Sequence, residues 1–454
     1  MKRHAILGTT LLAVALAACE APLDVEPRAS VPSEEALTDA AAVAAAANGL
    51  YNSLQGDDAF GRNLVVYPDL YADNLRFTGT FTTDQQVGLR TITPNNGSIA
   101  GLWTTAYGGI NDANEVLAAI PQVSDLTEAN AARYRGEALF VRALHYFNLV
   151  RLFGGVPIIT EPSRTAADAA ARAVPRSTQA EVYALIERDL EEAARLLPTG
   201  RVVGRASQMT AHALLARVYL EDGKYALARD KANTVINSGL YRLVTRYSDL
   251  YEIKNSVESI LELQYTIQDS NAHAFWFFPN RGGLGGRWGY APTSAASASV
   301  LTPLLAAFET GDTRRTATIG GPVSGRYYGR KYFRIENGDD NVILLRLAEM
   351  YLIRAEANAR LNADPAVVRA DIDIVRQRAG LPPLPATLTA QADLLSAILR
   401  ERRVELALEG HRFFDLRRFG QAQQVLGLTA DRLLFPIPQR ELDVNPRLDQ
   451  NPGY

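Results

Sequence analysis

The amino-acid sequence predicts a mainly α-helical protein, in which a helical-repeat scaffold carries an irregular, loop-rich portion with short β segments. Three observations lead to this fold class. Apolar residues recur at three- and four-residue spacing over long stretches of the first half of the chain. Several segments look like versions of one helical unit. Two stretches, 56–100 and 240–345, interrupt this pattern and are rich in Gly, Asn, Thr and Tyr.

Three stretches carry the helical signal most clearly. Residues 38–54 begin with Thr-Asp and continue in helix-forming alanines. Residues 132–158 keep the helical spacing until Gly154-Gly155, with Pro157 beyond, which is typical of a helix end. In 101–120 the residues expected on one helix face are Trp103, Tyr107, Ile110, Asn114 and Leu117.

The repeated unit is clearest in residues 211–232. Its Ala216, Tyr219, Ala228 and Ala232 match the small and aromatic positions of a tetratricopeptide helix pair. Small residues at these positions let paired helices approach closely. Residues 138–154 and 348–362 align with this segment less closely. We therefore expect a tetratricopeptide-like scaffold whose spacing is too irregular for a regular solenoid.

The interrupted stretches are expected to form the loop-rich portion. Short β-like runs occur there at "SILELQYTI" (259–267) and "GRYYGRKYF" (325–333). We expect one body over residues 36–454. Its helical scaffold is expected mainly at 36–55, 101–240 and 340–420, and its loop-rich portion mainly at 56–100 and 241–339. Long irregular segments in a compact protein are usually functional.

The N-terminus predicts export. Residues 1–18 have a basic start, an apolar stretch and small residues, the pattern of a signal peptide. They end directly before Cys19, the only cysteine of the chain, as in a bacterial lipobox whose cysteine becomes lipidated. The following Pro-rich, acidic residues suit a flexible tether over 19–35. We expect a lipid-anchored protein outside the cytoplasm, stabilised by packing because one cysteine forms no intrachain disulfide.

Composition excludes several classes of function. The net charge is −3 and no basic block is present, which argues against a nucleic-acid partner. The five histidines are not placed at metal-ligand spacing, so neither a zinc site nor a cofactor is expected. Glu405 and Glu409 lie one helical turn apart, as a glycosidase pair could. Arginines crowd them at 402, 403, 412, 417 and 418, and structural ion pairs are therefore favoured over a catalytic pair.

Two aromatic stretches are candidate binding segments. Rings that stack on a ligand, beside polar groups that fix its edge, hold sugars and peptides without reacting with them. In 274–290 we expect Phe275 and Phe277 to anchor the segment, and Trp276 to point the other way if 275–278 is extended. Core packing is the alternative for each ring. The candidate ligand-binding residues are Trp276, Trp288, Tyr290 and Arg287 in this stretch, with Tyr71, Asp73, Asn74, Arg76 and Phe77 in the loop-like stretch 65–81.

Several motifs in order along the chain resemble the SusD/RagB family. They are the lipobox, "EALFVRALHYFNLVRLFGGVPI" (137–158), "LRLAEMYLIRAEANAR" (345–360), "VRQRAGLP" (375–382), "RRVELALEGHRFFDLRRFG" (402–420) and "FPIPQRELDVNPRLDQNPGY" (435–454). The resemblance implies a non-catalytic, surface-exposed outer-membrane lipoprotein that captures nutrients. It implies four tetratricopeptide-like helix pairs, with ligand contacts drawn from regions near 60–105 and 270–330.

The resemblance also implies a partner and a ligand class. Members act as a lid on a SusC-like TonB-dependent transporter, and the scaffold generally faces that transporter. Their ligands are mostly oligosaccharides, and oligopeptides in some members. We expect oligosaccharide capture here. Oligopeptide capture, a surface glycoside hydrolase and a scaffold without a ligand stay open as alternatives.

Overall fold

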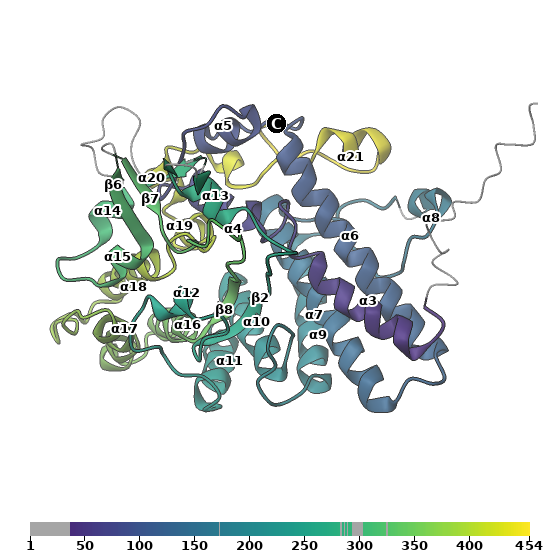
Figure 1. Ribbon diagram of the computed structural model, residues 1–454, viewed down its shortest axis with the longest axis horizontal. Coiled ribbons are helices and arrows are strands. Elements are labelled where there is room, and N and C mark those ends of the chain that lie inside the picture. The colour runs from purple at the N-terminus through teal and green to yellow at the C-terminus, as the bar shows by residue number, and fades with distance from the viewer. Residues whose placement is uncertain are drawn as a thin grey trace, which may run out of the picture.

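The computed structural model describes residues 37–171, 173–281, 284–285, 287, 289–292, 303–323 and 326–454. About 54% of the chain is helical and its strands are few and short, which confirms the mainly α-helical prediction (Figure 1). The expected signal peptide (1–18), Cys19 and the tether (19–35) lie outside the described residues. Within the described part of the chain, no helix has the length and apolarity needed to cross a membrane.

A series of packed helices forms the scaffold. Along the series, α6 packs on α7, α7 on α9, α9 on α10, α10 on α11 and α11 on α16, and α16 contacts both α17 and α18. The scaffold helices are α3 (Ala40–Asn52), α6 (Gly97–Ala119), α7 (Glu128–Phe153), α9 (Gln179–Leu196), α10 (Gln208–Glu221), α11 (Tyr225–Asn237), α16 (Leu347–Arg360), α17 (Pro365–Arg378), α18 (Gln391–Glu405) and α19 (Arg412–Arg418).

Local signals in the sequence set the ends of these helices. Asp39 caps α3 by accepting a hydrogen bond from the Ala42 amide. Thr178 and Glu181 form a capping box at the start of α9. Helix α7 ends at Phe153, and its C-cap residue Gly154 has a φ of 79°, which suits glycine. The expected helices at 38–54, 101–120 and 132–158 are therefore confirmed.

The pair α10–α11 has the packing expected of a tetratricopeptide unit. Ala216, Ala228 and Ala232 are completely buried, and Tyr219 is nearly so. The small side chains allow the two helices to lie close together. Helix α16, from the less exact repeat, packs against α11 and continues the series.

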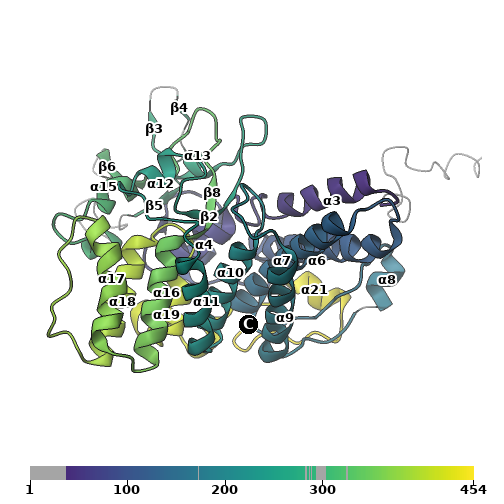
Figure 2. The same cartoon turned by 90° about the horizontal axis from the view of Figure 1, so that it is seen from below.

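The loop-rich portion stands on one side of the scaffold helices (Figure 2). Among the described residues it has four small sheets, each an antiparallel pair: β1 with β5, β2 with β8, β3 with β4 and β6 with β7. Its elements are α4 (Asn63–Tyr71), β1 (Arg76–Phe77), α5 (Thr82–Leu89), α12 (Asp249–Glu252), β2 (Ser259–Leu263), α13 (His273–Phe277), β3 (Asn280–Arg281), β4 (Leu284–Gly285), β5 (Tyr290–Ala291), α14 (Pro303–Ala307), α15 (Arg314–Thr318), β6 (Ile319–Val323), β7 (Arg326–Gly329) and β8 (Val342–Arg346).

Five short helical segments complete the described part of the chain. Figure 1 shows α21 beside one end of α6. The segments are η1 (Ile120–Gln122), α8 (Ala166–Ala171), α20 (Ala422–Leu426), η2 (Ala430–Leu433) and α21 (Gln439–Val444).

The stretch 56–100 is more helical than the sequence predicts. Tyr71 was expected in a loop-like context, but it is the last residue of α4. Nearly all of α4 is buried, so tertiary packing stabilises a helix that lacks a side-chain cap and contains Pro68. The expected β runs are confirmed in part, as β2 and β7.

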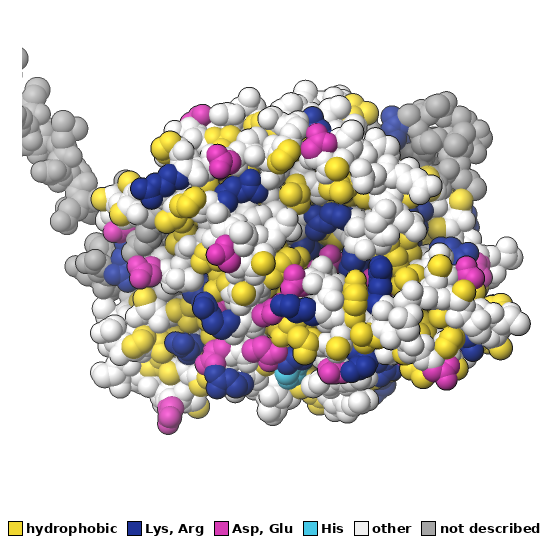
Figure 3. Space-filling view, turned by 180° about the vertical axis from the view of Figure 1, so that it is seen from behind, with side chains coloured by type: hydrophobic (Ala, Val, Ile, Leu, Met, Phe, Trp, Pro, Cys, Tyr) yellow, Lys and Arg dark blue, Asp and Glu magenta, His cyan; other side chains and the backbone are white. Residues whose placement is uncertain are grey.

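Strands β2 and β8 connect the two portions. Every residue of both strands is buried, and β8 runs directly into α16. On the face seen in Figure 3, Lys and Arg side chains are interspersed with Asp and Glu rather than gathered by sign. This distribution agrees with the small net charge of −3.

Candidate functional site

The aromatic stretch after β2 forms a helical turn. Residues 273–277 are α13, so the extended arrangement considered for 275–278 is wrong. The helical turn exposes 40% of Phe275 and buries Trp276 and Phe277. Phe277 anchors the segment in the core, as expected. Phe275 was expected to do the same but lies at the surface, and Trp276, expected to bind a ligand, is buried.

Trp276 is covered by side chains of the same molecule. The guanidinium carbons of Arg62 and Arg287 each lie 5.1 Å from the centroid of its ring. A Cβ at Gly289 would lie 2.7 Å from Cε3 of Trp276, so the tryptophan needs a glycine beside it. Trp276 therefore supports the surface rather than presenting a free ring face.

Two exposed phenylalanine rings and the guanidinium group of Arg287 contact the ring of Trp276. Phe81 is 42% exposed, and its ring meets Trp276 edge to face with a centroid distance of 6.0 Å. Phe275 meets Trp276 in the same way at 5.7 Å. The guanidinium carbon of Arg287 lies 4.4 Å from the Phe81 ring centroid. We call Phe81, Phe275 and Arg287, with Trp276 beneath them, the aromatic face.

Backbone hydrogen bonds hold the aromatic face together. The Arg287 amide donates to the carbonyl oxygen of Phe275 at 2.6 Å, and the Gly289 amide donates to that of Trp276 at 2.7 Å. The Thr78 amide in turn donates to the carbonyl oxygen of Gly289 at 2.8 Å. These bonds bring Thr78, Phe275 and Arg287 close together, so two stretches far apart in the sequence build one surface. Such preorganisation reduces the entropy lost when a ligand binds.

Tyr290 belongs to the core. It is completely buried, and its hydroxyl donates to Oδ1 of Asp84 at 2.5 Å. Burial raises the pKa of the Tyr290 hydroxyl above its ordinary value. Its ring lies 5.5 Å from that of Trp276. The structure therefore gives Tyr290 an anchoring position and leaves its ring no surface for a ligand.

The candidate rings Tyr71 and Phe77 are buried too. Tyr71 meets Phe413 and Phe435 edge to face, and its hydroxyl donates to the Arg432 carbonyl oxygen at 2.9 Å. Phe77 packs on Tyr290. Both rings fill core space between α4, β1 and the C-terminal helices, which corrects their expected ligand-binding role.

The polar candidates beside them have structural partners. Asp73 accepts hydrogen bonds from Arg412 at 2.8 Å and pairs with Arg403 at 2.9 Å. Burial alone would raise the pKa of Asp73, but the two arginines outweigh it and lower that pKa. Asn74 is buried and donates to the Asp69 carboxylate. Arg403 also donates to Oδ1 of Asn74 at 3.0 Å, so Asp73 and Asn74 tie the segment after α4 to α18 and α19 and are occupied by structural contacts.

Two candidates remain. Arg76 is half-buried on β1, opposite Ala291. Trp288 lies outside the described residues. Of the nine candidates, only Arg287 contributes directly to the aromatic face, and Trp276 supports it.

Comparisons with known proteins place the chain in a family. A model of the SusD family matches residues 310–433, and a model described as starch-binding, associating with outer membrane, matches residues 23–220. The chain belongs to the SusD/RagB family.

SusD-like proteins similar to this chain cover most or all of its length. SusD-like protein P38 of Formosa agariphila is 28% identical over 515 residues, which span 100% of both chains. The starch-binding protein SusD of Bacteroides thetaiotaomicron is 26% identical over 432 residues, 74% of this chain and 75% of that protein. A solved laminarin-binding SusD-like protein is 29% identical with a TM-score of 0.79, covering 92% of this chain and 100% of that one.

In this SusD-like chain, the carboxylates of Glu405 and Glu409 both form ion pairs with arginine or lysine side chains. Glu405 is completely buried and pairs with Arg314 at 2.9 Å, with Arg346 at 2.5 Å and with Arg378. Glu409 pairs with Lys331 and with Arg346. The expectation of structural ion pairs is confirmed. The partners come from other elements, however, and not from the neighbouring arginines of the same stretch.

These pairs set the protonation state of Glu405. Burial alone would raise its pKa, but Arg378, Arg346 and Arg314 outweigh burial and hold that pKa well below its usual value. A general acid needs the opposite shift. The described residues contain no group of three or more His, Cys, Asp or Glu side chains able to hold a metal ion.

Sequence reasoning missed Phe81 as a surface ring. Phe81 is the N-cap residue of α5, directly before Thr-Thr-Asp. A large apolar side chain directly before a helix is only a weak indication in the sequence that the side chain is exposed. Its pairing with Arg287, 206 positions away, is visible only in the structure.

Proposed function

We propose that this protein is a non-catalytic carbohydrate-binding lipoprotein of the cell surface. It captures oligosaccharides at the aromatic face and passes them to a SusC-like TonB-dependent outer-membrane transporter. The observation that carries the proposal is the preorganised pair of exposed rings, Phe81 and Phe275, held around Arg287. Single exposed apolar side chains are common, but these two rings gather on one residue, Trp276, and grouped apolar side chains mark contact sites.

The chemistry of the aromatic face suits a sugar chain. The apolar C–H side of a pyranose ring packs on an aromatic face, while Arg287 offers guanidinium hydrogen bonds to hydroxyl groups. The relatives support this ligand class, because one solved neighbour is named for laminarin and one relative for starch. Both are glucans.

Cell-surface attachment is the second part of the proposal. We propose that residues 1–18 are removed, that Cys19 is lipidated and that 19–35 form the tether. Residues 36–454 then act as one body, with the helical scaffold toward the transporter and the aromatic face away from it. The family description "associating with outer membrane" supports this placement. The ion-paired state of Glu405 and Glu409 supports a binding role without hydrolysis.

The test uses a soluble form that begins at residue 20. We expect laminarin or starch oligosaccharides to bind in isothermal titration calorimetry, and each of Phe81→Ala and Phe275→Ala to weaken binding about tenfold. The matched control is Leu227→Ala, because Leu227 on α11 is 44% exposed but lies on the scaffold. The control should bind like the parent protein.

Three outcomes contradict the proposal. Unchanged affinity in the double variant Phe81→Ala/Phe275→Ala would remove the aromatic face from binding. Binding of short peptides without any glucan would favour oligopeptide capture. Release of reducing sugar that is lost in Glu405→Gln would show a hydrolase.

A further inference from the structure

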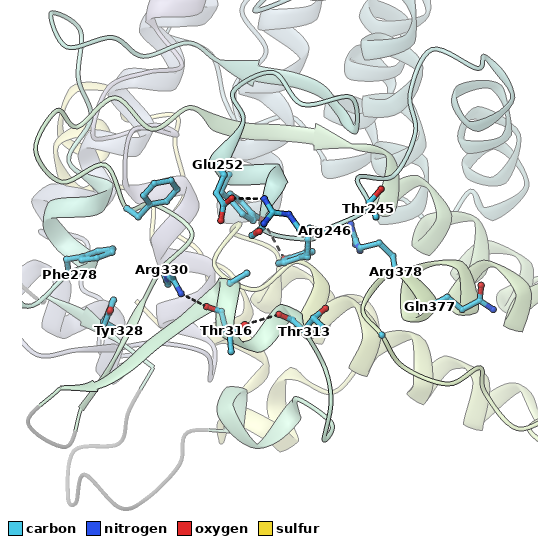
Figure 4. A pocket seen from close by; sticks show the side chains of 16 residues that line it. Thr245, Arg246, Glu252, Phe278, Thr313, Thr316, Tyr328, Arg330, Gln377 and Arg378 are labelled. Carbon is cyan, nitrogen blue, oxygen red and sulfur yellow. Dashed lines mark hydrogen bonds and ion pairs between the residues drawn. The ribbon is translucent and has the colours of Figure 1, made fainter.

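A concave region, separate from the aromatic face, lies where the scaffold meets the loop-rich portion. It is a pocket of about 830 Å³, within the size range of small-molecule sites. Its walls come from the segment 245–252 that ends in α12, from Phe278 after α13, from α15, from β7 with Arg330, and from the end of α17. Figure 4 shows Phe278 and Tyr328 at one end and Gln377 at the other.

An aromatic corner forms one end of this pocket. The rings of Phe278 and Tyr328 are half-buried and lie 4.9 Å apart, tilted by 54°. Tyr328 pairs with Gly320 across the β6–β7 ladder, and a methyl group on Gly320 would overlap the tyrosine ring. The glycine therefore lets the Tyr328 ring lie on the sheet, which fixes its orientation. Phe333 adds a third half-buried ring to the lining.

Arg330 supplies a charge beside this corner. Its side chain is exposed, and Nη1 donates to the Thr316 carbonyl oxygen at 3.2 Å (Figure 4). No acidic side chain among the described residues pairs with Arg330. Arg246 differs, because Asp249 and Glu252 both pair with it. Arg330 therefore has guanidinium N–H groups that no carboxylate in the described part of the chain occupies, and these groups can donate hydrogen bonds to an anionic group of a ligand.

Arg378 forms a buried part of the lining. Arg378 pairs with Glu258 and Glu405 through its two Nη atoms, and its side chain is 4% exposed. Its Nε has no hydrogen-bond partner among the described residues. This atom is itself inaccessible to solvent, so Arg378 is a fixed part of the pocket wall and does not donate to an occupant. The hydroxyl groups of Thr313, Thr316 and Ser248 add further polar contacts to the lining.

We propose that this pocket is a second glycan subsite, selective for a sugar unit that carries a carboxylate or sulfate group. The sugar ring packs in the corner of Phe278 and Tyr328, and its anionic group binds the Arg330 guanidinium. Arg–anion hydrogen bonds are directional and stronger than neutral ones, so the charge decides selectivity. The aromatic face is not needed for this site, and the two sites are tested separately.

The experiment compares defined probes by calorimetry on the soluble form. The probes are a galacturonic-acid tetrasaccharide, a sulfated galactan tetrasaccharide, neutral laminarihexaose and tetra-alanine. We expect at least one acidic sugar to bind and to lose about tenfold in affinity in Arg330→Gln. Arg330→Lys should keep part of that affinity, and rising salt should weaken it. Whichever acidic probe responds identifies carboxylate or sulfate as the preferred group.

A matched control separates the pocket from general charge effects. Arg315→Gln removes the same charge from an exposed neighbour on α15 that does not line the pocket. The proposal is overturned if neither acidic sugar binds, or if Arg330→Gln and Arg315→Gln behave alike. It is also overturned if tetra-alanine alone responds to Arg330→Gln. Phe81→Ala/Phe275→Ala should leave the acidic-sugar response to Arg330→Gln intact, even if glucan binding fails.

Discussion

Replacing Glu405 by Gln tests the buried ion network that joins the scaffold to the loop-rich portion. The substitution keeps the side-chain volume and removes one negative charge that three arginines share. Glu405 is completely buried, so water cannot replace the lost charge. We expect the variant to fold with a lower free energy of unfolding.

The remaining partners of the three arginines set the magnitude. Arg314 keeps Asp312 and Glu401, and Arg346 keeps Glu258 and Glu409. Arg378 keeps Glu258, which it shares with Arg346. No cation is left fully uncompensated, so the loss should fall near the lower end of the range for a broken buried pair, at about 3 kcal/mol.

Urea unfolding at pH 7, followed by circular dichroism, measures this loss. The control is Glu309→Gln, because Glu309 also pairs with an arginine but its side chain is 55% exposed. The control should change the free energy of unfolding by less than about 1 kcal/mol. If Glu405→Gln proves as stable as this control, the network does not contribute as described.

The remaining predictions concern a buried histidine, a helix end and an ion pair. Burial lowers the pKa of His145 from 6.5 to about 4, so stability present above pH 6.5 should fall by about 3 kcal/mol toward pH 4. In His145→Gln, the urea concentration at half-unfolding should depend less on pH between about 4 and 6.5 than in the parent protein. An equal dependence on pH in both proteins would contradict the role of His145. Gly154→Ala should cost about 1–2 kcal/mol in thermal unfolding, because φ is 79° and a Cβ would lie 2.9 Å from Cδ1 of Leu434; equal melting temperatures would refute this. Asp73, with its lowered pKa, stabilises the fold above about pH 4 and loses this effect as the pH falls. Asp73→Asn should therefore cost about 2 kcal/mol at pH 7 and approach the parent protein in acid, whereas a constant difference at all pH values would exclude the charge as its cause.

Most of the scaffold could be predicted because its signals are local. The cap at Asp39, the glycine at 154 and the small residues of α10–α11 each act within a few positions of the chain. Helix α4 was missed, since its stability comes from burial by distant segments and its own sequence lacks a cap. The same contrast explains why the ion pairs of Glu405 were expected but their partners were not.

The sequence predicted which regions of the chain build the candidate site, but it did not predict which of their residues lie at the surface. Residues near 60–105 and 270–330 do meet at the aromatic face, through Phe81 and Arg287. The sequence could not decide which rings are exposed, since exposure depends on what covers each ring. Arg62 and Gly289 lie at Trp276, and Asp84 binds the hydroxyl of Tyr290.

The sequence by itself determined a helical scaffold and an aromatic, glycine-rich segment set into it. Apolar period, caps and small residues act over one or two helical turns, so they can be read without a structure. Tertiary structure alone decided that Phe275 is outside while Trp276 and Tyr290 are inside. It also brought Tyr328 and Arg330 into one pocket with Phe278 and with the segment 245–252. Burial and pairing are set by side chains far away in the sequence, and only folding brings those together.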